Sequence, residues 1–186
     1  MRLLLATRNA HKVREFARLL GDVELDPLPD EAGTPEETGE TYAENALIKA
    51  RAAAAATGRA AIADDSGVEA AVLGGGPGVR SARYAGADAS DGENLALFRE
   101  QVPAGSALRY VCVIAHVAPD GAETLFEGVC EGTMAAEGAG TRGFGYDPVF
   151  VPDGERRTMA ELTDAEKDAI SHRGRAARAL REWLEA

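Results

Sequence analysis

Two adjacent carboxylates stand in the middle of the chain, in the segment ADDSG at residues 63–67. An apolar run precedes Asp64 and Asp65, so they come at the end of what reads as a buried strand. Burial and like-charge repulsion both oppose this pairing, and a bound cation would offset them. Two carboxylates followed by Ser66 could hold Mg²⁺ and position a water, because this ion prefers a carboxylate or two and the oxygens of a substrate phosphate. The alternative is a local turn capped by Asp64, without a metal.

Two further segments suit a metal and a phosphate. Glu36 and Glu37, in PEETGET, are a second acidic pair that could complete the metal shell. The segment ATRNAHK lies between a predicted strand and a predicted helix, where free N–H groups and the helix dipole favour a phosphate. Asn9 adds a neutral donor and Lys12 a cation, although the GxxxxGK[ST] pattern of a P-loop is absent. An ordinary loop with solvated Lys12 and His11 is the alternative.

The segment GFGYDP could receive a flat ligand. Phe144 and Tyr146 are flanked by glycines, which allow the backbone to approach a ring while an aromatic side chain stacks on it. Asp147 could accept a hydrogen bond from a ring N–H. A tight turn with one core aromatic residue explains the same letters equally well.

A cluster of donors follows in EKDAISHRG, near the end of the chain. Lys167, His172 and Arg173 gather around a predicted break in the last helix. They could bond a carbonyl-bearing base or a phosphate, and a solvated basic helix face is the alternative.

The elements that must position these residues alternate between strand and helix. We expect strands at residues 2–6 and 60–65, a hairpin from residues 108–117 and 123–134, and a short strand at VFVP. Helical spacing covers residues 12–20, and a second helix opens at Thr41, which forms a capping box with Glu44 and stops at Gly58. Two more helices follow, the last one interrupted near residues 171–174. The pattern predicts one α/β domain, residues 1–186, with a mixed central sheet flanked by helices and two lobes.

Composition limits the partners of the protein. The chain has 186 residues and a net charge of -11, which argues against a nucleic-acid polymer because phosphate backbones require a basic footprint. It does not exclude a single nucleotide. Since no apolar run approaches the roughly 20 residues of a membrane helix, we expect no membrane association. Cys112 and Cys130 read as free thiols of a reducing cytoplasm. The separate signals together point to a nucleotide held in a cleft between the lobes.

Five ordered segments carry a resemblance to a known family. ATRNAHKVRE, EETGETYAENALIKA, ADDSGVEAAVLGGGPGVRSARYAG, GFGYDPVF and TMAELTDAEKDAISHRGRA resemble the signatures of the inosine triphosphate pyrophosphatase family, the Ham1-like XTP/dITP diphosphatases. The resemblance runs from Leu4 to about Ala179. Arg8, Met159 and Asp168 depart from the family pattern, and Arg8 could alter phosphate contacts.

The resemblance implies an activity and a site. It implies an elongated homodimer that hydrolyses ITP, dITP and XTP to the monophosphate and pyrophosphate with Mg²⁺, cleansing the nucleotide pool. Asp65 would be general base and metal ligand, with Glu36 or Glu37 also near the metal, and Lys12 would assist catalysis. The residues that would bind substrate are Thr7, Arg8, Asn9, Ala10, His11, Lys12, Lys49, Ser66, Phe144, Gly145, Tyr146, Asp147, Lys167, His172 and Arg173.

Two rival functions stay open at this point. A Maf-like pyrophosphatase would act on modified or pyrimidine nucleotides, and activity on dTTP or UTP above ITP would favour it. A regulatory module would bind a nucleotide without turnover, but such a binder needs no general base.

Overall fold

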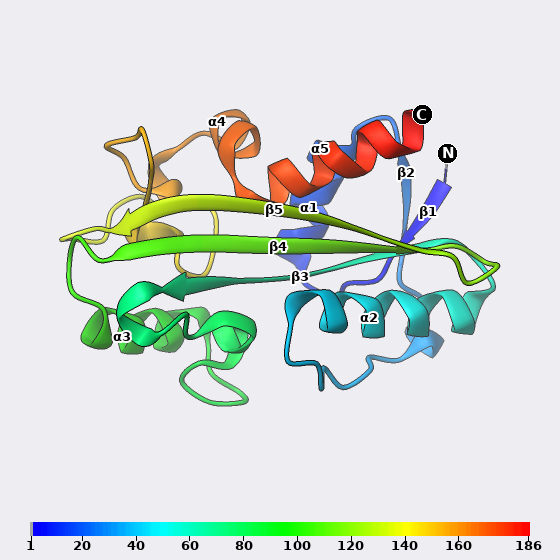
Figure 1. The fold of residues 1–186 in the computed structure, drawn as a ribbon, viewed down its shortest axis with the longest axis horizontal. Helices are drawn as coiled ribbons and strands as arrows, with labels where there is room; N and C mark the ends of the chain where they lie inside the picture. The colour runs from blue at the N-terminus through cyan, green and yellow to red at the C-terminus, as the bar shows by residue number, and fades with distance from the viewer. Residues whose placement is uncertain (1) are drawn as a thin grey trace. The chain divides into compact units, whose positions relative to one another are not determined.

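A computed structural model describes residues 2–186 as an α/β fold built on one mixed sheet (Figure 1). The described strands lie in the order β2-β1-β3-β4-β5-β6. They are β1 (Arg2–Leu5), β2 (Glu24–Pro27), β3 (Ala61–Ala70), β4 (Ala107–Val117), β5 (Glu123–Met134) and β6 (Phe150–Pro152). The α-helices are α1 (Ala10–Leu20), α2 (Tyr42–Thr57), α3 (Asp91–Gln101), α4 (Asp164–Ile170) and α5 (His172–Glu185). Since β1 pairs in parallel with β2 and β3 while β5 pairs antiparallel with β6, the predicted mixed α/β sheet is confirmed.

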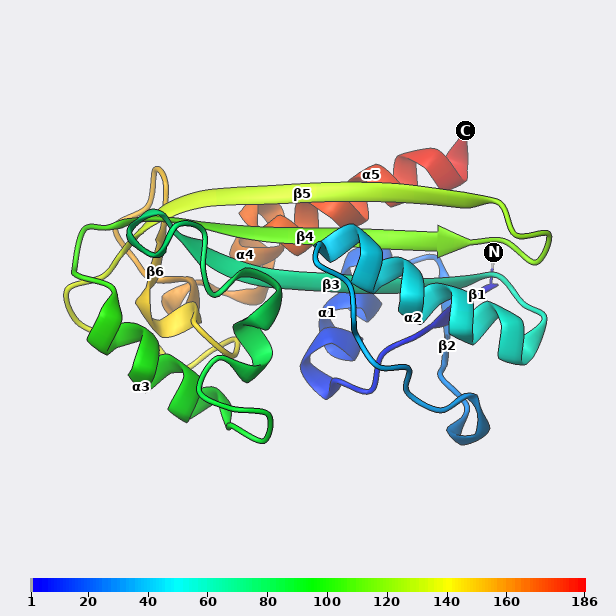
Figure 2. The same cartoon turned by 60° about the horizontal axis from the view of Figure 1, so that its bottom comes forward.

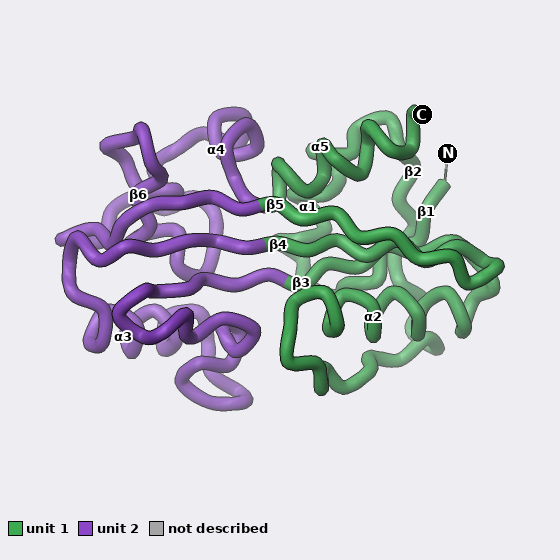
Figure 3. The backbone as a smooth tube through the Cα atoms, in the orientation of Figure 1, with its two compact units in different colours: residues 1–65, 112–128, 173–186 green, residues 66–111, 129–172 purple. Residues whose placement is uncertain are grey.

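The chain divides into two compact units, which Figure 3 colours separately. Unit 1 comprises residues 1–65, 112–128 and 173–186, and unit 2 comprises residues 66–111 and 129–172. Strands β3, β4 and β5 each contribute residues to both units.

Unit 1 has an apolar layer on each face of its strands, as the alternation of side chains along a strand requires. Leu3, Leu5 and Ile62 pack with buried residues of α1 and α5. Leu4, Ala61 and Ala63 pack on the alanine-rich side of α2. Helix α2 therefore covers one face, and α1 and α5 cover the other (Figure 1).

The core cluster of unit 2 combines aliphatic residues with four buried aromatic side chains, Phe98, Tyr110, Tyr146 and Phe150. Phe98 of α3 meets the Tyr146 ring edge-on at 4.9 Å between centroids. Tyr110 of β4 lies against Phe150 at 4.4 Å. Large side chains of this kind contribute much of the apolar burial that stabilises a small core.

Local sequence signals predicted several boundaries of helices and strands correctly. The Thr41 capping box is present at the start of α2, and Gly58 ends the helix in the left-handed conformation at φ 67°. Strands β4 and β5 form the predicted hairpin (Figure 2), closed where the Ala118 N–H donates to the Ala122 carbonyl. The break in the last helix is also confirmed, because Ser171 separates α4 from α5.

Candidate active site

The paired aspartates lie within a strand, so the prediction that they end one is wrong. Strand β3 continues through Asp64 and Asp65 to Ala70. Successive side chains of a strand point to opposite faces, so the two carboxylates have different surroundings. Asp64 contacts residues of α1 and α5, whereas Asp65 contacts residues of α2. The nearby cations reduce the repulsion that the sequence suggested, because Lys12 and Arg173 contact Asp64 while Lys49 lies nearest Asp65.

Asp64 is fully enclosed by a network of ion pairs. Lys12 Nζ lies 3.0 Å and Arg173 Nη2 3.2 Å from Asp64 Oδ2, and the other Arg173 terminal nitrogen pairs with Glu15. Burial alone would raise the pKa of Asp64, but the cations of Lys12 and Arg173 outweigh it and hold the pKa well below its ordinary value. The Cys112 thiol also faces this carboxylate, and burial raises the pKa of the thiol. Asp64 is therefore a permanent anion and a poor proton acceptor.

Asp65 has the opposite electrostatic character. Its Oδ2 accepts a hydrogen bond of 3.1 Å from Asn45 Nδ2, and its Oδ1 lies 3.8 Å from Lys49 Nζ. Burial raises the pKa of Asp65 above its ordinary value, although Lys49 and Lys12 oppose the rise, and Glu37 adds to it. A carboxylate with a raised pKa accepts a proton more readily at neutral pH, so Asp65 is the better general base of the pair.

Asn45 and Glu15 belong to this cluster and were missed from the sequence. Asn45 is fully buried, and it also accepts a hydrogen bond of 2.8 Å from the Gly39 N–H. It lies four residues before Lys49 on α2, and Glu15 lies three residues after Lys12 on α1. Such spacings place side chains on one helix face, so the periodicity could have revealed both residues.

The loop at residues 7–12 begins α1 and is held by a side-chain cap. Asn9 Oδ1 accepts from the backbone N–H groups of His11 and Lys12 and caps α1, while donation from the Asn9 amide nitrogen to a phosphate stays a prediction. The Arg8 side chain turns toward residues 29–34, with Nη1 at 3.2 Å from Asp30 Oδ1. Thr7 Oγ1 accepts from the Asn9 N–H, and the other two loop residues, Ala10 and His11, are exposed. Of this loop, the Lys12 ammonium is the group that lies at the aspartates.

The acidic segment before α2 contributes one carboxylate to the cluster. Glu37 Oε1 lies 3.2 Å from Lys49 Nζ and is half-buried, whereas Glu36 is exposed. Lys49 thus contacts Asp65 and Glu37 together. Among residues 2–186, no three His, Cys, Asp or Glu side chains gather into a metal-binding group. Asp65 and Glu37 are accordingly the two carboxylates that could share a cation with an incoming phosphate. Ser66 is half-buried and directly follows Asp65 on β3.

Unit 2 contains a second buried polar cluster, centred on Asp147. Asp147 Oδ2 accepts from Lys167 Nζ at 2.7 Å and from the Phe144 N–H at 2.9 Å. Lys167 Nζ also lies 5.3 Å from the centre of the Phe144 ring, which is only partly buried. Gly143 makes the close approach possible, since it has a positive φ of 71° and a Cβ there would lie 2.0 Å from Asp147 Oδ2.

Two aromatic residues of this region take unexpected places. Tyr146, a predicted stacking residue, is buried in the core, where its hydroxyl donates to the Ser81 carbonyl at 2.7 Å. Phe144 is therefore the better candidate to stack on a ligand. Tyr110 was missed, because nothing in its strand letters marks it. Its hydroxyl donates to Asp147 Oδ1 at 3.1 Å, and its ring stacks on His172.

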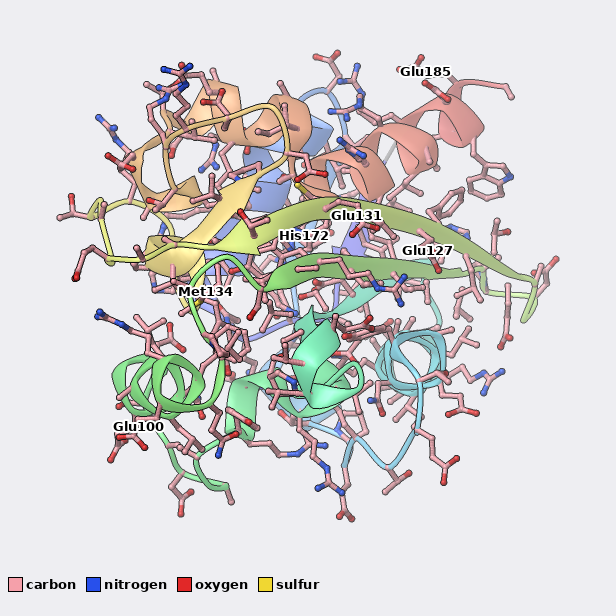
Figure 4. All side chains as sticks on the ribbon, turned by 60° about the vertical axis from the view of Figure 1, so that its left-hand side comes forward. Glu100, Glu127, Glu131, Met134, His172 and Glu185 are labelled. Atoms are coloured by element: carbon pink, nitrogen blue, oxygen red, sulfur yellow. The ribbon has the colours of Figure 1, made fainter. Side chains whose placement is uncertain are left out.

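The donors near the chain end do not form one group. His172 lies against β4 (Figure 4), with its ring 4.5 Å from Tyr110 and nearly parallel to it. Arg173, which was predicted to join Lys167 and His172 at a base, belongs to unit 1 and gives its guanidinium to Glu15 and Asp64. His172 and Arg173 are successive residues of α5, and such residues point about 100° apart around a helix, so the two side chains meet different neighbours.

Comparisons with known proteins agree on one family. The Ham1 family model matches residues 3–183. The dITP/XTP pyrophosphatase of Streptomyces avermitilis is 48% identical over 190 residues, covering 96% of this chain and 94% of that protein. The enzyme of the same name from Escherichia coli O157:H7 is 48% identical and covers 98% of each chain. The structure of a HAM1 protein from Coxiella burnetii is 43% identical over the full length of both chains, with a TM-score of 0.87. In residues 2–186, no helix has the length and apolar character needed to cross a membrane.

Proposed function

The chain belongs to the Ham1 family, and from this premise we propose that it hydrolyses non-canonical purine nucleoside triphosphates to the monophosphate and pyrophosphate. The substrates are dITP, XTP and ITP, and the reaction removes them from the nucleotide pool. The observation that carries the proposal is the difference between the surroundings of the paired aspartates. The pKa of Asp64 is lowered, so it is held as an anion, while the pKa of Asp65, beside Lys49, is raised. Relatives named for dITP and XTP give the Maf-like alternative no support.

Asp65 is the proton acceptor in the proposed reaction. A water attacks the α-phosphorus, its proton passes to Asp65, and the bond between this phosphorus and the bridging oxygen breaks as pyrophosphate leaves. The Asn45 hydrogen bond to Oδ2 and the Lys49 contact at Oδ1 hold the Asp65 carboxylate in position for this proton transfer. General-base assistance of this kind is worth about 10²- to 10⁴-fold in rate.

Lys12 and Lys49 neutralise the triphosphate. Both ammonium groups contact the aspartate pair and keep only a small exposed fraction, 14% and 13% of the side chain. In such a setting a positive charge stabilises a developing anion more strongly than it would in water. Asp64 holds the Lys12 ammonium in place through their ion pair, which is a reason for a second carboxylate that does not itself take the proton.

The residues fit a bound Mg²⁺. Asp65 and Glu37 already share the Lys49 ammonium, and hard carboxylate oxygens with substrate phosphates are what this ion prefers. Glu37 is the better candidate of the acidic pair, because Glu36 is exposed. When bound, Mg²⁺ would neutralise phosphate charge and lower the pKa of a coordinated water.

The Asp147 cluster is the proposed recognition site for the base. Oxopurines carry a 6-oxo group and an N1–H, whereas adenine carries a 6-amino group and an unprotonated N1. Lys167 and His172 would donate to the oxo group, and Asp147 would accept from N1–H, with Phe144 stacked on the ring. Adenine would offer Lys167 and His172 no 6-oxo acceptor and Asp147 no N1–H donor, and a site built on such hydrogen bonds can discriminate by about 10⁴-fold. Arg173 has no part in this assignment, because its guanidinium is used by two carboxylates.

We further propose a homodimer and a cytoplasmic location. The homodimer rests on the family resemblance, and light scattering on the purified protein would test it. The location follows from the substrate, because triphosphates that threaten nucleic-acid synthesis arise where nucleotides are made.

The direct test is hydrolysis with separate detection of the two products. The purified protein with Mg²⁺ is given ITP, dITP, XTP, GTP and ATP, and pyrophosphate and orthophosphate are quantified. We expect pyrophosphate from the first three, and Asp65→Asn as a matched control should lose it. Release of orthophosphate, or preferred hydrolysis of ATP, would contradict the proposal.

A further inference from the structure

Tyr110 connects two groups that the proposed function places on the base. Its hydroxyl donates a 3.1 Å hydrogen bond to Asp147 Oδ1. Its ring stacks on the His172 imidazole, with 4.5 Å between centroids and 11° between planes. The tyrosine ring also packs on the core side chain of Phe150, with 4.4 Å between centroids.

We propose that Tyr110 is a positioning residue for purine selection, because its hydroxyl orients the Asp147 carboxylate while its ring sets the plane of His172. This inference rests on the proposed function, in which Asp147 and His172 read the base. Tyr110 itself is 6% exposed, and we assign it no contact with substrate.

The three donors to Asp147 are not equivalent. Lys167 and the Phe144 N–H both donate to Oδ2, so these two hydrogen bonds alone would allow the carboxylate to rotate about that oxygen. The Tyr110 hydroxyl bonds Oδ1 and comes from strand β4, whereas Lys167 belongs to the short helix α4 and Phe144 to a loop. It therefore fixes the rotation of the carboxylate. A carboxylate oxygen offers about two acceptor sites, so Oδ1 keeps one for a ring N–H, and its direction depends on Tyr110.

The ring of Tyr110 acts on His172 in a comparable way. His172 follows directly after Ser171 and is the first residue of α5. The N–H bonds of an imidazole lie in the ring plane, so a parallel partner at 4.5 Å determines the plane in which His172 can donate. One side chain thus orients an acceptor and a donor together.

The hydroxyl is not needed for packing. A phenylalanine would fill the same space against Phe150 and keep the stack on His172, but it would release Asp147 Oδ1. Tyr110→Phe therefore isolates the hydrogen bond, and Tyr110→Leu removes the hydrogen bond and the stack.

The experiment compares these variants on ITP and ATP with KM and kcat measured separately. Hydrogen bonds to charged groups support an expected loss of about tenfold in kcat/KM for ITP in Tyr110→Phe, mainly through KM, with a smaller ratio of ITP to ATP hydrolysis. Tyr110→Leu should lose more. Tyr84→Phe is the matched control, because it removes a hydroxyl bonded to Gln101 in the same unit, and it should behave as wild type.

A double-mutant cycle separates positioning from general loss of structure. In an Asp147→Ala background, Tyr110→Phe should have little further effect on the ITP to ATP ratio, because the acceptor of the Tyr110 hydroxyl is already absent. An additive effect, or a Tyr110→Phe enzyme with unchanged KM and unchanged ratio, would overturn the inference alone. A wild-type protein that hydrolyses none of the purine triphosphates would instead overturn the proposed function, and the inference with it.

Discussion

Substitution of the two adjacent aspartates by asparagine should separate stability from catalysis. Asp64→Asn removes a buried negative charge from beside Lys12 and Arg173, whose side chains are 14% and 2% exposed. Breaking one partner out of a buried ion pair costs about 3–5 kcal/mol. Glu15 still neutralises Arg173, so we expect the lower end, about 3 kcal/mol. Asp65→Asn relieves burial of a charge and should leave the free energy of unfolding unchanged or higher.

The pH dependence of stability should differ in sign between the two sites. The folded pKa of Asp64 is lowered, so its stabilising contribution is present above the ordinary value of 3.8 and is lost as the pH falls through the folded pKa. The deficit of Asp64→Asn should therefore shrink in acid. The folded pKa of Asp65 is raised, so its charge costs stability above that pKa. Any gain of Asp65→Asn should accordingly vanish in acid.

The assay is urea unfolding, followed by the fluorescence of Trp183, the single tryptophan of the chain, which lies in unit 1 with both aspartates. Activity on ITP is measured on the same samples. We expect Asp64→Asn to be less stable yet to keep measurable turnover, and Asp65→Asn to be stable and to lose about 10²-fold or more. Equal loss of stability in both variants, or higher turnover in Asp65→Asn than in Asp64→Asn, would refute the assignment of roles.

Three further predictions follow from single contacts. Gly143→Ala should lower the free energy of unfolding by about 1–3 kcal/mol, because alanine is strained at φ 71°. It should also raise KM for ITP by displacing Asp147. Urea unfolding and steady-state kinetics measure the two effects, and unchanged values would argue against the close approach of Gly143 to Asp147. Glu37→Gln should weaken Mg²⁺ dependence in a metal titration, whereas Glu36→Gln, the exposed control, should not; equal effects would contradict the choice of ligand. Cys112, fully buried with a raised pKa, should resist iodoacetamide in the folded protein and react in urea, as mass spectrometry would detect.

Sequence alone determined what depends on neighbours along the chain. The capping box of Thr41 and the left-handed Gly58 bound α2 correctly, because caps are made by residues three or four positions apart. The mixed α/β architecture followed from strand and helix periodicities, and the ordered motifs placed the chain in its family. The choice of Asp65 as general base came from the same resemblance.

Tertiary structure decided the partners of each charge. Arg173 reaches Asp64 from 109 positions away, and this contact moves it from the predicted base site to an ion-pair network. Tyr110, 37 positions from Asp147, is joined to it only by folding, whereas the helical spacing of Asn45 from Lys49 left a trace in the sequence. The alternation along a strand predicts that neighbouring side chains point to opposite faces, but it does not predict which residues they contact. The pKa of a carboxylate depends on the burial and cations around it, so the difference between two identical adjacent residues exists only in the folded chain.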